Sequence, residues 1–110
     1  MDINLKATNT TITPSIKQMV EEKLSSLEKF LKPEDIIHVE VEVDKFKDSG
    51  EVHRVEVRIQ PKGYFADATG SDLYEALDLV MPKIREQLTR EKDKRVSLRR
   101  KLGALFKRSK

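Results

Sequence analysis

At 110 residues with 37% hydrophobic side chains, the chain has room for one domain around one modest core. No apolar run approaches the roughly 20 residues that cross a bilayer, no signal-peptide pattern opens the chain, and the absence of cysteine excludes disulfides and favours a cytoplasmic location. Residues 1–81 carry 10 basic and 16 acidic side chains (−6), and residues 82–110 carry 12 basic and 3 acidic (+9), so the net +3 hides a segregated charge. Such segregation predicts a surface that faces a polyanion, with a merely solvated basic tail as the alternative.

The first third of the chain predicts a strand followed by a helix. Residues 2–8 alternate apolar and polar side chains, which is typical of a half-buried strand. Thr13 then supplies an N-cap and Pro14 a proline at the first helical position. Apolar residues recur at helical spacing over residues 14–32, which predicts an amphipathic helix. Pro33 ends this helix because the residue before a proline is pushed out of helical geometry.

The middle of the chain predicts three strands. Residues 37–44 and 53–60 alternate with a period of two and are separated by a polar turn at 47–50. If they pair as a hairpin, acidic side chains of the first run are expected to lie across from basic side chains of the second, namely Glu40 and Glu42 from Arg54 and Arg58. A second turn at 61–63 leads to a short strand over residues 64–69.

A long amphipathic helix is expected to follow. It opens at Asp72, with Glu75 three residues later in a capping-box pattern, and helical character should persist to about Lys94. Pro82 falls opposite the apolar seam, so it should bend the helix around the sheet and leave the packing face intact.

The predicted order is therefore β-α-β-β-β-α. It indicates an α+β two-layer sandwich, a four-stranded sheet with both helices on one face, similar to a double-stranded-RNA-binding domain. We expect the folded domain to cover residues 1–95. Residues 96–110 are expected to form a basic, flexible tail, because their few apolar side chains cannot offset the entropy of ordering.

Catalytic and metal-binding chemistry find little support in the sequence. The two histidines, without cysteine, do not supply the four nitrogen or sulfur ligands of a structural zinc site. There is no glycine-rich phosphate loop, and the acidic row on residues 40–44 is typical of a solvated strand face. We therefore expect neither an enzyme nor a bound cofactor, metal or small-molecule substrate.

The sharper signal lies on the last helix. Four residues spaced by four, three and four positions form one stripe beside the apolar seam: Lys83, Gln87, Arg90 and Lys94. Cations spaced along a rigid helix can meet successive phosphates of a folded nucleic acid. There is no exposed aromatic ladder of the kind that stacks single-stranded bases, which favours recognition of the RNA backbone and shape.

Three segments resemble the ribosome hibernation-promoting factor family, which includes the protein-Y-type ribosome-associated inhibitor. They are ITPSIKQMVEEKLSSLEKF (residues 12–30), ADATGSDLYEALD (66–78) and KIREQLTREKDK (83–94). The resemblance covers residues 1–95 and is to the short form of the family, because the long form continues into a second, dimer-forming domain. The basic tail resembles the hibernation-promoting branch, since the inhibitor branch typically ends in an acidic tail.

The resemblance implies a protein that binds the small ribosomal subunit at the decoding channel. There it would block messenger and transfer RNA and silence translation under stress or in stationary phase. The implied partners are the small subunit and its ribosomal RNA, and whole ribosomes, including ribosome dimers. The implied RNA-binding residues on the first helix are Lys17, Lys23 and Lys29, which join Lys83, Gln87, Arg90 and Lys94 on the second.

Two alternatives remain open from the sequence. One is a general structured-RNA-binding or ribosome assembly protein. Against it, the last helix of this chain begins with Ser71 and Asp72, and the Asp72 carboxylate repels phosphate. The other is a membrane-surface or protein-interaction module that uses residues 96–110 as a basic amphipathic anchor, interrupted by Gly103.

Overall fold

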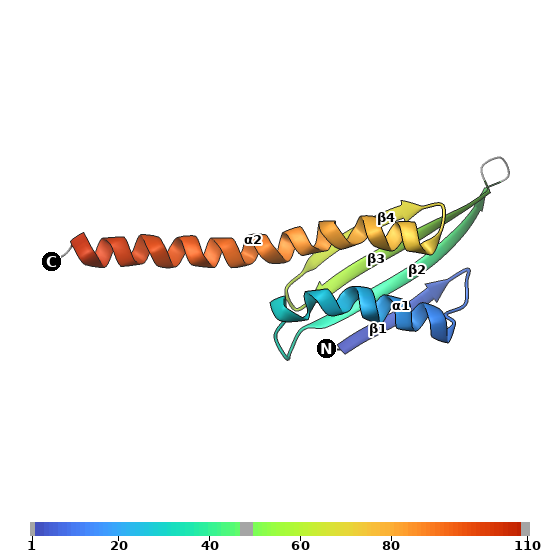
Figure 1. The fold of residues 1–110 in the computed structure, drawn as a ribbon, viewed down its shortest axis with the longest axis horizontal. Coiled ribbons are helices and arrows are strands. Elements are labelled where there is room, and N and C mark those ends of the chain that lie inside the picture. The colour runs from blue at the N-terminus through green and yellow to red at the C-terminus, as the bar shows by residue number, and fades with distance from the viewer. Residues whose placement is uncertain (1, 47–49, 109–110) are drawn as a thin grey trace.

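The computed structural model describes the chain over residues 2–46 and 50–108, with side chains as far as Arg90, except that of Phe46. Its elements are β1 (Asp2–Thr8), α1 (Pro14–Leu24), the 3-10 helix η1 (Ser25–Phe30), β2 (Ile36–Phe46), β3 (Gly50–Gln60), β4 (Tyr64–Gly70) and α2 (Leu73–Arg108). The predicted β-α-β-β-β-α order is confirmed, with η1 as a short continuation of α1 (Figure 1).

The four strands form one sheet in the order β1-β2-β3-β4. β1 pairs with β2 in parallel, while β2–β3 and β3–β4 are antiparallel. Parallel neighbours need a crossover connection, and α1 with η1 supplies it between β1 and β2. Both helices cover the same face of the sheet, so the predicted two-layer sandwich is confirmed (Figure 1).

The register of β2 against β3 agrees only in part with the expected charge pairs. Glu42 lies directly opposite Arg54, as expected. Glu40, however, lies opposite Glu56, and Arg58 lies one same-face position further along, so the expected Glu40–Arg58 pair was wrong. Because side chains alternate with a period of two, slipping the hairpin by two residues keeps every apolar residue on the core face. The alternation therefore could not select between these two registers.

The predicted single helix over residues 14–32 is divided into α1 and η1. Two consecutive serines open η1, and both hydroxyls donate back to backbone carbonyls of α1: Ser25 Oγ to Glu22 O (2.6 Å) and Ser26 Oγ to Lys23 O (3.1 Å). Serine side chains that bond the preceding turn compete with the helical ladder. The tighter 3-10 winding over the next turn is the result.

The helix starts follow the predicted caps. Thr13 Oγ1 accepts from the Ile16 amide at 3.2 Å, with Pro14 at the first turn of α1. At the start of α2, the Glu75 amide donates to Asp72 Oδ1 at 2.8 Å, which is one half of the predicted capping box. The Glu75 carboxylate instead accepts from Ser71 Oγ at 2.8 Å.

α2 is longer than the sequence pattern predicted. It passes through the exposed Pro82 and continues beyond Lys94 to Arg108. Residues 95–108 are rich in Arg, Lys and Leu, which are good helix formers, and this composition favours a helical backbone. The division into a folded domain to residue 95 and a flexible tail beyond it remains a prediction.

The core lies between the sheet and the two helices. It is built from the inward-facing aliphatic residues of the strands and the apolar seams of the helices: Val20, Leu24, Leu27, Ile37, Val39, Val41, Val55, Val57, Ile59, Ala66, Ala68, Leu73, Ala76, Leu77, Val80, Met81, Ile84 and Leu88. Asp35 is the one buried charged residue in the described part of the chain. It accepts from the Lys32 amide at 2.8 Å and pairs with Lys62 Nζ at 3.5 Å. These two contacts compensate for removing the carboxylate from water.

Candidate nucleic-acid interface

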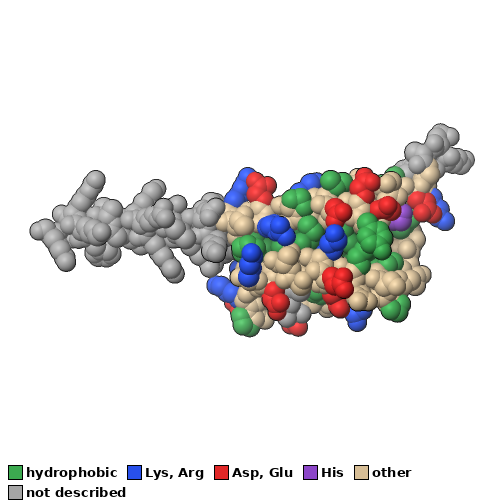
Figure 2. Space-filling view, in the orientation of Figure 1, with side chains coloured by type: hydrophobic (Ala, Val, Ile, Leu, Met, Phe, Trp, Pro, Cys, Tyr) green, Lys and Arg blue, Asp and Glu red, His purple; other side chains and the backbone are tan. Residues whose placement is uncertain are grey.

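The helical face of the molecule carries basic side chains over both helices, interspersed with acidic ones (Figure 2). α1 and α2 run in the same direction across the sheet, and two polar contacts join them (Figure 1). Lys23 Nζ of α1 binds Asp78 Oδ1 of α2 at 2.6 Å, and Arg85 Nη2 of α2 donates to Ser26 Oγ of η1 at 2.9 Å. These contacts place Lys23 and Arg85 along the junction between the helices.

The opposite flank of α2 faces β4. Lys83 Nζ donates to the backbone carbonyl of Asp67 at 2.9 Å. Gln87 bonds the backbone of Phe65 twice: its Nε2 donates to the carbonyl at 2.6 Å, and its Oε1 accepts from the amide at 3.1 Å. Two members of the predicted RNA-binding stripe therefore hold α2 to the outer edge of β4.

The remaining predicted site residues differ in how firmly they are held. Arg90 is exposed and pairs with Glu86 at 2.6 Å, one turn earlier in α2. Lys29 is exposed, with its ammonium 5.1 Å from the centre of the Phe30 ring. The Lys17 side chain is exposed and makes no hydrogen bond or ion pair with the described residues. Lys94 lies on α2, but its side chain is outside the described residues.

The predicted residues of the first and the last helix thus lie along different flanks of α2. Lys23, a residue of α1, contacts the flank of α2 that faces α1. Lys83 and Gln87 lie on the other flank of α2, which faces β4. Arg85, which the predicted site omitted, shares the first flank with Lys23. Its position was readable from the sequence, because it follows Asp78 by seven residues, two helical turns along the same face. Gln87 contributes chiefly to docking α2, since both ends of its amide are already bonded.

The largest concentration of positive charge lies on α2 from Lys83 onward. From Lys83 to Arg108 the helix carries 11 basic and 3 acidic residues, a balance of +8. At about 1.5 Å per residue, this stretch is roughly 40 Å long. Figure 1 shows that much of it extends beyond the sheet, and the molecule measures 70 Å along its longest axis. A cationic rod of this length can follow the phosphates of a folded RNA over several nucleotides.

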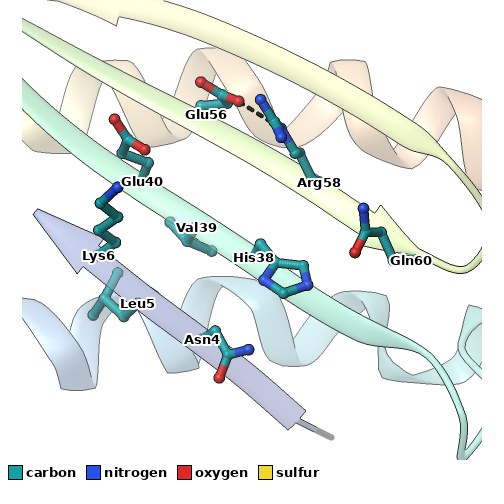
Figure 3. A pocket seen from close by; sticks show the side chains of 9 residues that line it. All are labelled: Asn4, Leu5, Lys6, His38, Val39, Glu40, Glu56, Arg58 and Gln60. Carbon is teal, nitrogen blue, oxygen red and sulfur yellow. Dashed lines mark hydrogen bonds and ion pairs between the residues drawn. The ribbon is translucent and has the colours of Figure 1, made fainter.

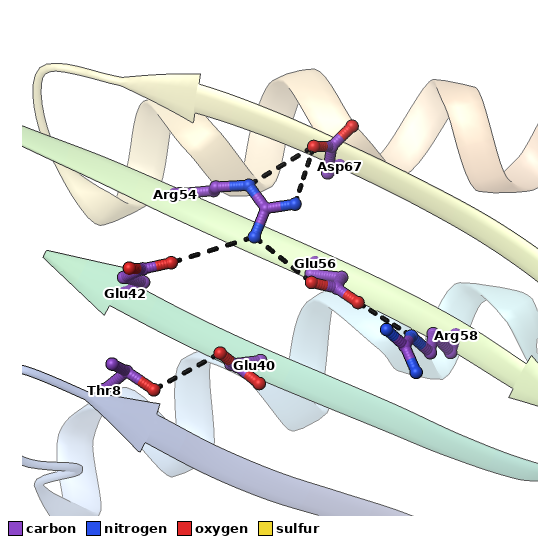
Figure 4. Close-up of polar contacts among 7 residues, drawn as sticks. All are labelled: Thr8, Glu40, Glu42, Arg54, Glu56, Arg58 and Asp67. Carbon is purple, nitrogen blue, oxygen red and sulfur yellow. Dashed lines mark hydrogen bonds and ion pairs between the residues drawn. The ribbon is translucent and has the colours of Figure 1, made fainter.

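The open face of the sheet, by contrast, carries a net negative charge. Arg54 joins three strands there, with carboxylate oxygens of Glu42 at 3.8 Å, Glu56 at 3.1 Å and Asp67 at 2.8 Å (Figure 4). The hydrogen bonds that Arg54 donates to Asp67, reinforced by Glu56 and opposed by partial burial, raise the pKa of the Arg54 guanidinium. Three basic and six acidic described side chains on this face give −3: Lys6, Arg54 and Arg58 against Asp2, Glu40, Glu42, Asp44, Glu56 and Asp67.

A shallow polar hollow of about 560 Å³ lies on this open face (Figure 3). It is lined by side chains of β1, β2 and β3, among them Lys6, His38, Glu40 and Arg58. Its carboxylates disfavour a phosphate ligand. Within the described residues, no group of three or more His, Cys, Asp or Glu side chains is placed to hold a metal ion. No helix in that part of the chain is long and apolar enough to span a membrane.

Comparison with known proteins gives consistent matches over almost the whole chain. Residues 3–96 match the family model described as Sigma 54 modulation protein / S30EA ribosomal protein. A ribosome hibernation promoting factor of Klebsiella oxytoca is 30% identical over 94 residues, covering 86% of this chain and 96% of that protein.

Solved structures are similar at comparable identity. The protein Y N-terminal domain of Thermus thermophilus has a TM-score of 0.67 at 27% identity, over 82% of this chain and 98% of that one. A ribosomal subunit interface protein of Coxiella burnetii has a TM-score of 0.64 at 26% identity, over 84% of this chain and 99% of that one. Sequence and fold therefore indicate the same group of proteins.

Proposed function

Because the chain belongs to the Sigma 54 modulation protein / S30EA ribosomal protein family, we propose that it is a ribosome hibernation factor that binds the small subunit at the decoding channel. Bound there, it blocks messenger and transfer RNA and silences translation under stress or in stationary phase. The relatives are named for promoting ribosome hibernation. This chain is likewise a binding protein and not an enzyme.

The observation that carries the proposal is the charge of α2. A balance of +8 on one helix, beginning at Lys83, favours a polyanionic partner such as ribosomal RNA. The two faces of the molecule therefore differ in the sign of their net charge. The open face, at −3, is repelled by phosphate, so the helical face is the one that approaches RNA.

Within the helical face, we assign RNA contacts first to Arg85, Arg90 and Lys94, with Lys17, Lys23 and Lys29 from the first helix beside them. Arg85 and Arg90 are exposed, and each makes a single described side-chain contact, so most of their donors remain available for phosphate. Lys83 is exposed and retains two of its three donors. Gln87 contributes by holding the helix in place.

The test is co-sedimentation of the RNA-free full chain with purified small subunits, and separately with purified large subunits. We expect the protein to pellet with small subunits and to prevent the binding of initiator transfer RNA and of messenger RNA. Cross-links from the protein should fall on small-subunit RNA near the decoding site. Cross-links confined to the large subunit, or undiminished binding of transfer RNA, would contradict the proposal.

The alternative function is general binding of structured RNA. Comparing the affinity of the protein for a plain RNA duplex with its affinity for the small subunit distinguishes the two functions. Such a binder has comparable affinity for a plain RNA duplex and for the small subunit at the same salt concentration. We expect the small subunit to be preferred, because α1, η1 and α2 present basic side chains in a fixed arrangement that a uniform duplex does not match.

A further inference from the structure

The two outer strands of the sheet differ in whether the backbone groups at their outer edges are covered. The edge of β4 is covered by α2, whose Lys83 and Gln87 side chains bond its outward backbone groups at Asp67 and Phe65. The edge of β1 has no such cover: in the described residues, no side chain or loop bonds the outward backbone of Asp2–Thr8. Figure 1 shows β1 at the border of the sheet remote from α2. An unprotected edge is a template for another strand.

The sequence of β1 is complementary to itself in antiparallel orientation. Pairing two copies about Asn4 places Asp2 opposite Lys6, and Lys6 opposite Asp2. The same register places Ile3 opposite Leu5, on the face that packs against the core. Opposite charges and apolar pairs directly across two strands both stabilise a sheet.

The charged residues of this register have no competing partners. The Asp2 and Lys6 side chains are exposed, and neither side chain makes a hydrogen bond or ion pair with the described residues. Lys6 points across the open face beside Glu40 of the neighbouring strand (Figure 3). Ile3 and Leu5 are only partly buried, so a second strand would remove more of their apolar surface from water.

We propose that the partner of the β1 edge is a second copy of this chain, paired antiparallel about Asn4 so that two four-stranded sheets become continuous. The interface is isologous, since each copy uses the same strand. It is small, so the association is weak and concentration-dependent. It requires no RNA, and it is therefore separable from binding to the ribosome.

Sedimentation equilibrium of the RNA-free full chain, from micromolar to millimolar protein, tests the association. The wild-type average mass should rise from monomer toward dimer. Asp2→Lys and Lys6→Asp each place like charges opposite one another, and each should weaken the dimer by about tenfold or more. The double variant Asp2→Lys/Lys6→Asp restores opposite charges and should restore dimerisation.

Matched measurements separate this contact from general electrostatic effects. Glu86→Lys changes the charge of an exposed residue on α2, remote from β1, and should leave the association unchanged (Figure 1). Melting curves check that each variant folds, and Asp2→Lys, which leaves Lys6 beside Glu40, remains decisive if the variants with Lys6→Asp prove unstable. Amide exchange at Ile3–Lys6 should slow as the protein concentration rises. A monomer at every concentration, or a dimer that both single variants leave intact, would overturn the proposal.

Discussion

The side-chain amide of Gln87 and the backbone of Phe65 bond each other at both ends, the amide nitrogen to the carbonyl at 2.6 Å and the amide oxygen to the N–H at 3.1 Å. Gln87 thus imitates a neighbouring strand and occupies the place where one could add to β4. With Lys83 it both docks α2 and blocks this edge of the sheet.

Gln87→Met should keep the length of the side chain and remove both hydrogen bonds. We expect a loss of about 1–2 kcal/mol in the free energy of unfolding, measured by chemical denaturation, because each bond contributes about 0.5–1.5 kcal/mol. Gln18→Met is the matched control, since the Gln18 amide makes only an exposed contact of 3.3 Å with Glu22. Equal effects of the two substitutions would show that the bonds to Phe65 contribute little.

Arg54→Gln should remove the cation that links Glu42, Glu56 and Asp67 across three strands. We expect a loss of about 1–2 kcal/mol in the free energy of unfolding, because the carboxylates then repel one another without a counter-charge. Interactions in the folded state raise the Arg54 pKa, so its contribution is present below the unfolded-state pKa and is lost only as the pH rises through the still higher folded-state pKa. The difference between variant and wild type should therefore stay constant from neutral to moderately alkaline pH.

Arg58→Gln is the control for that experiment. Arg58 is more exposed than Arg54, and among the described residues Glu56 is the one carboxylate that it contacts, so its loss should cost less than about 1 kcal/mol. A larger loss for Arg58 than for Arg54 would show that the three-strand link is not what stabilises this face.

Arg85→Glu should weaken binding to small subunits without unfolding the protein. Its guanidinium makes one exposed contact with Ser26, so stability should change little, while one phosphate contact is lost and a repulsive charge is introduced. In a pelleting titration, the log–log dependence of affinity on salt should flatten by about 0.7–0.9 for the lost contact. Lys45→Glu is the matched charge change on the far part of β2, and it should leave the salt dependence unaltered.

Deleting residues 96–110 tests the predicted division of the chain. We expect the melting temperature to stay nearly unchanged, since the core lies between Val20 and Leu88. Ribosome binding should weaken, most visibly at low salt, because the deleted segment carries six basic and no acidic residues. A large fall in melting temperature with unchanged pelleting would place the segment in the folded domain.

The sequence predicted the element order, the two-layer architecture and the helix starts, because each depends on local signals. Thr13 caps α1 through its own hydroxyl, and the alternation in β2 and β3 identifies their core faces from a few neighbours. The register of β2 against β3 depends instead on the turn between them. Two registers that differ by two residues bury the same side chains, so the pairing of Glu40 with Glu56 was not predictable from the alternation.

The candidate site was less predictable for a similar reason. A helical wheel places Gln87 in line with Lys83 and Arg90, but it does not reveal which strand passes beneath that flank of the helix. Only the tertiary structure brings Phe65, twenty-two residues earlier in the chain, against Gln87. On the opposite flank, Asp78 and Arg85 are spaced by two helical turns, and this spacing alone predicts that they share one face of α2. Asp78 contacts α1 and Arg85 contacts η1.

α2 packs on the sheet over its first turns and extends beyond the sheet after them, so it can act as a lever arm (Figure 1). Among the side chains that the structure describes, Leu88 is the last in the buried core, and the backbone remains helical to Arg108. At about 1.5 Å per residue the free arm is roughly 30 Å long, so a tilt of about one degree at its base moves the tip by about half an ångström. Substitutions beneath α2, such as at Val80 or Ile84, can therefore redirect distant positive charges without altering any of them. Binding to RNA should respond to the packing of this core as well as to the arginines and lysines themselves.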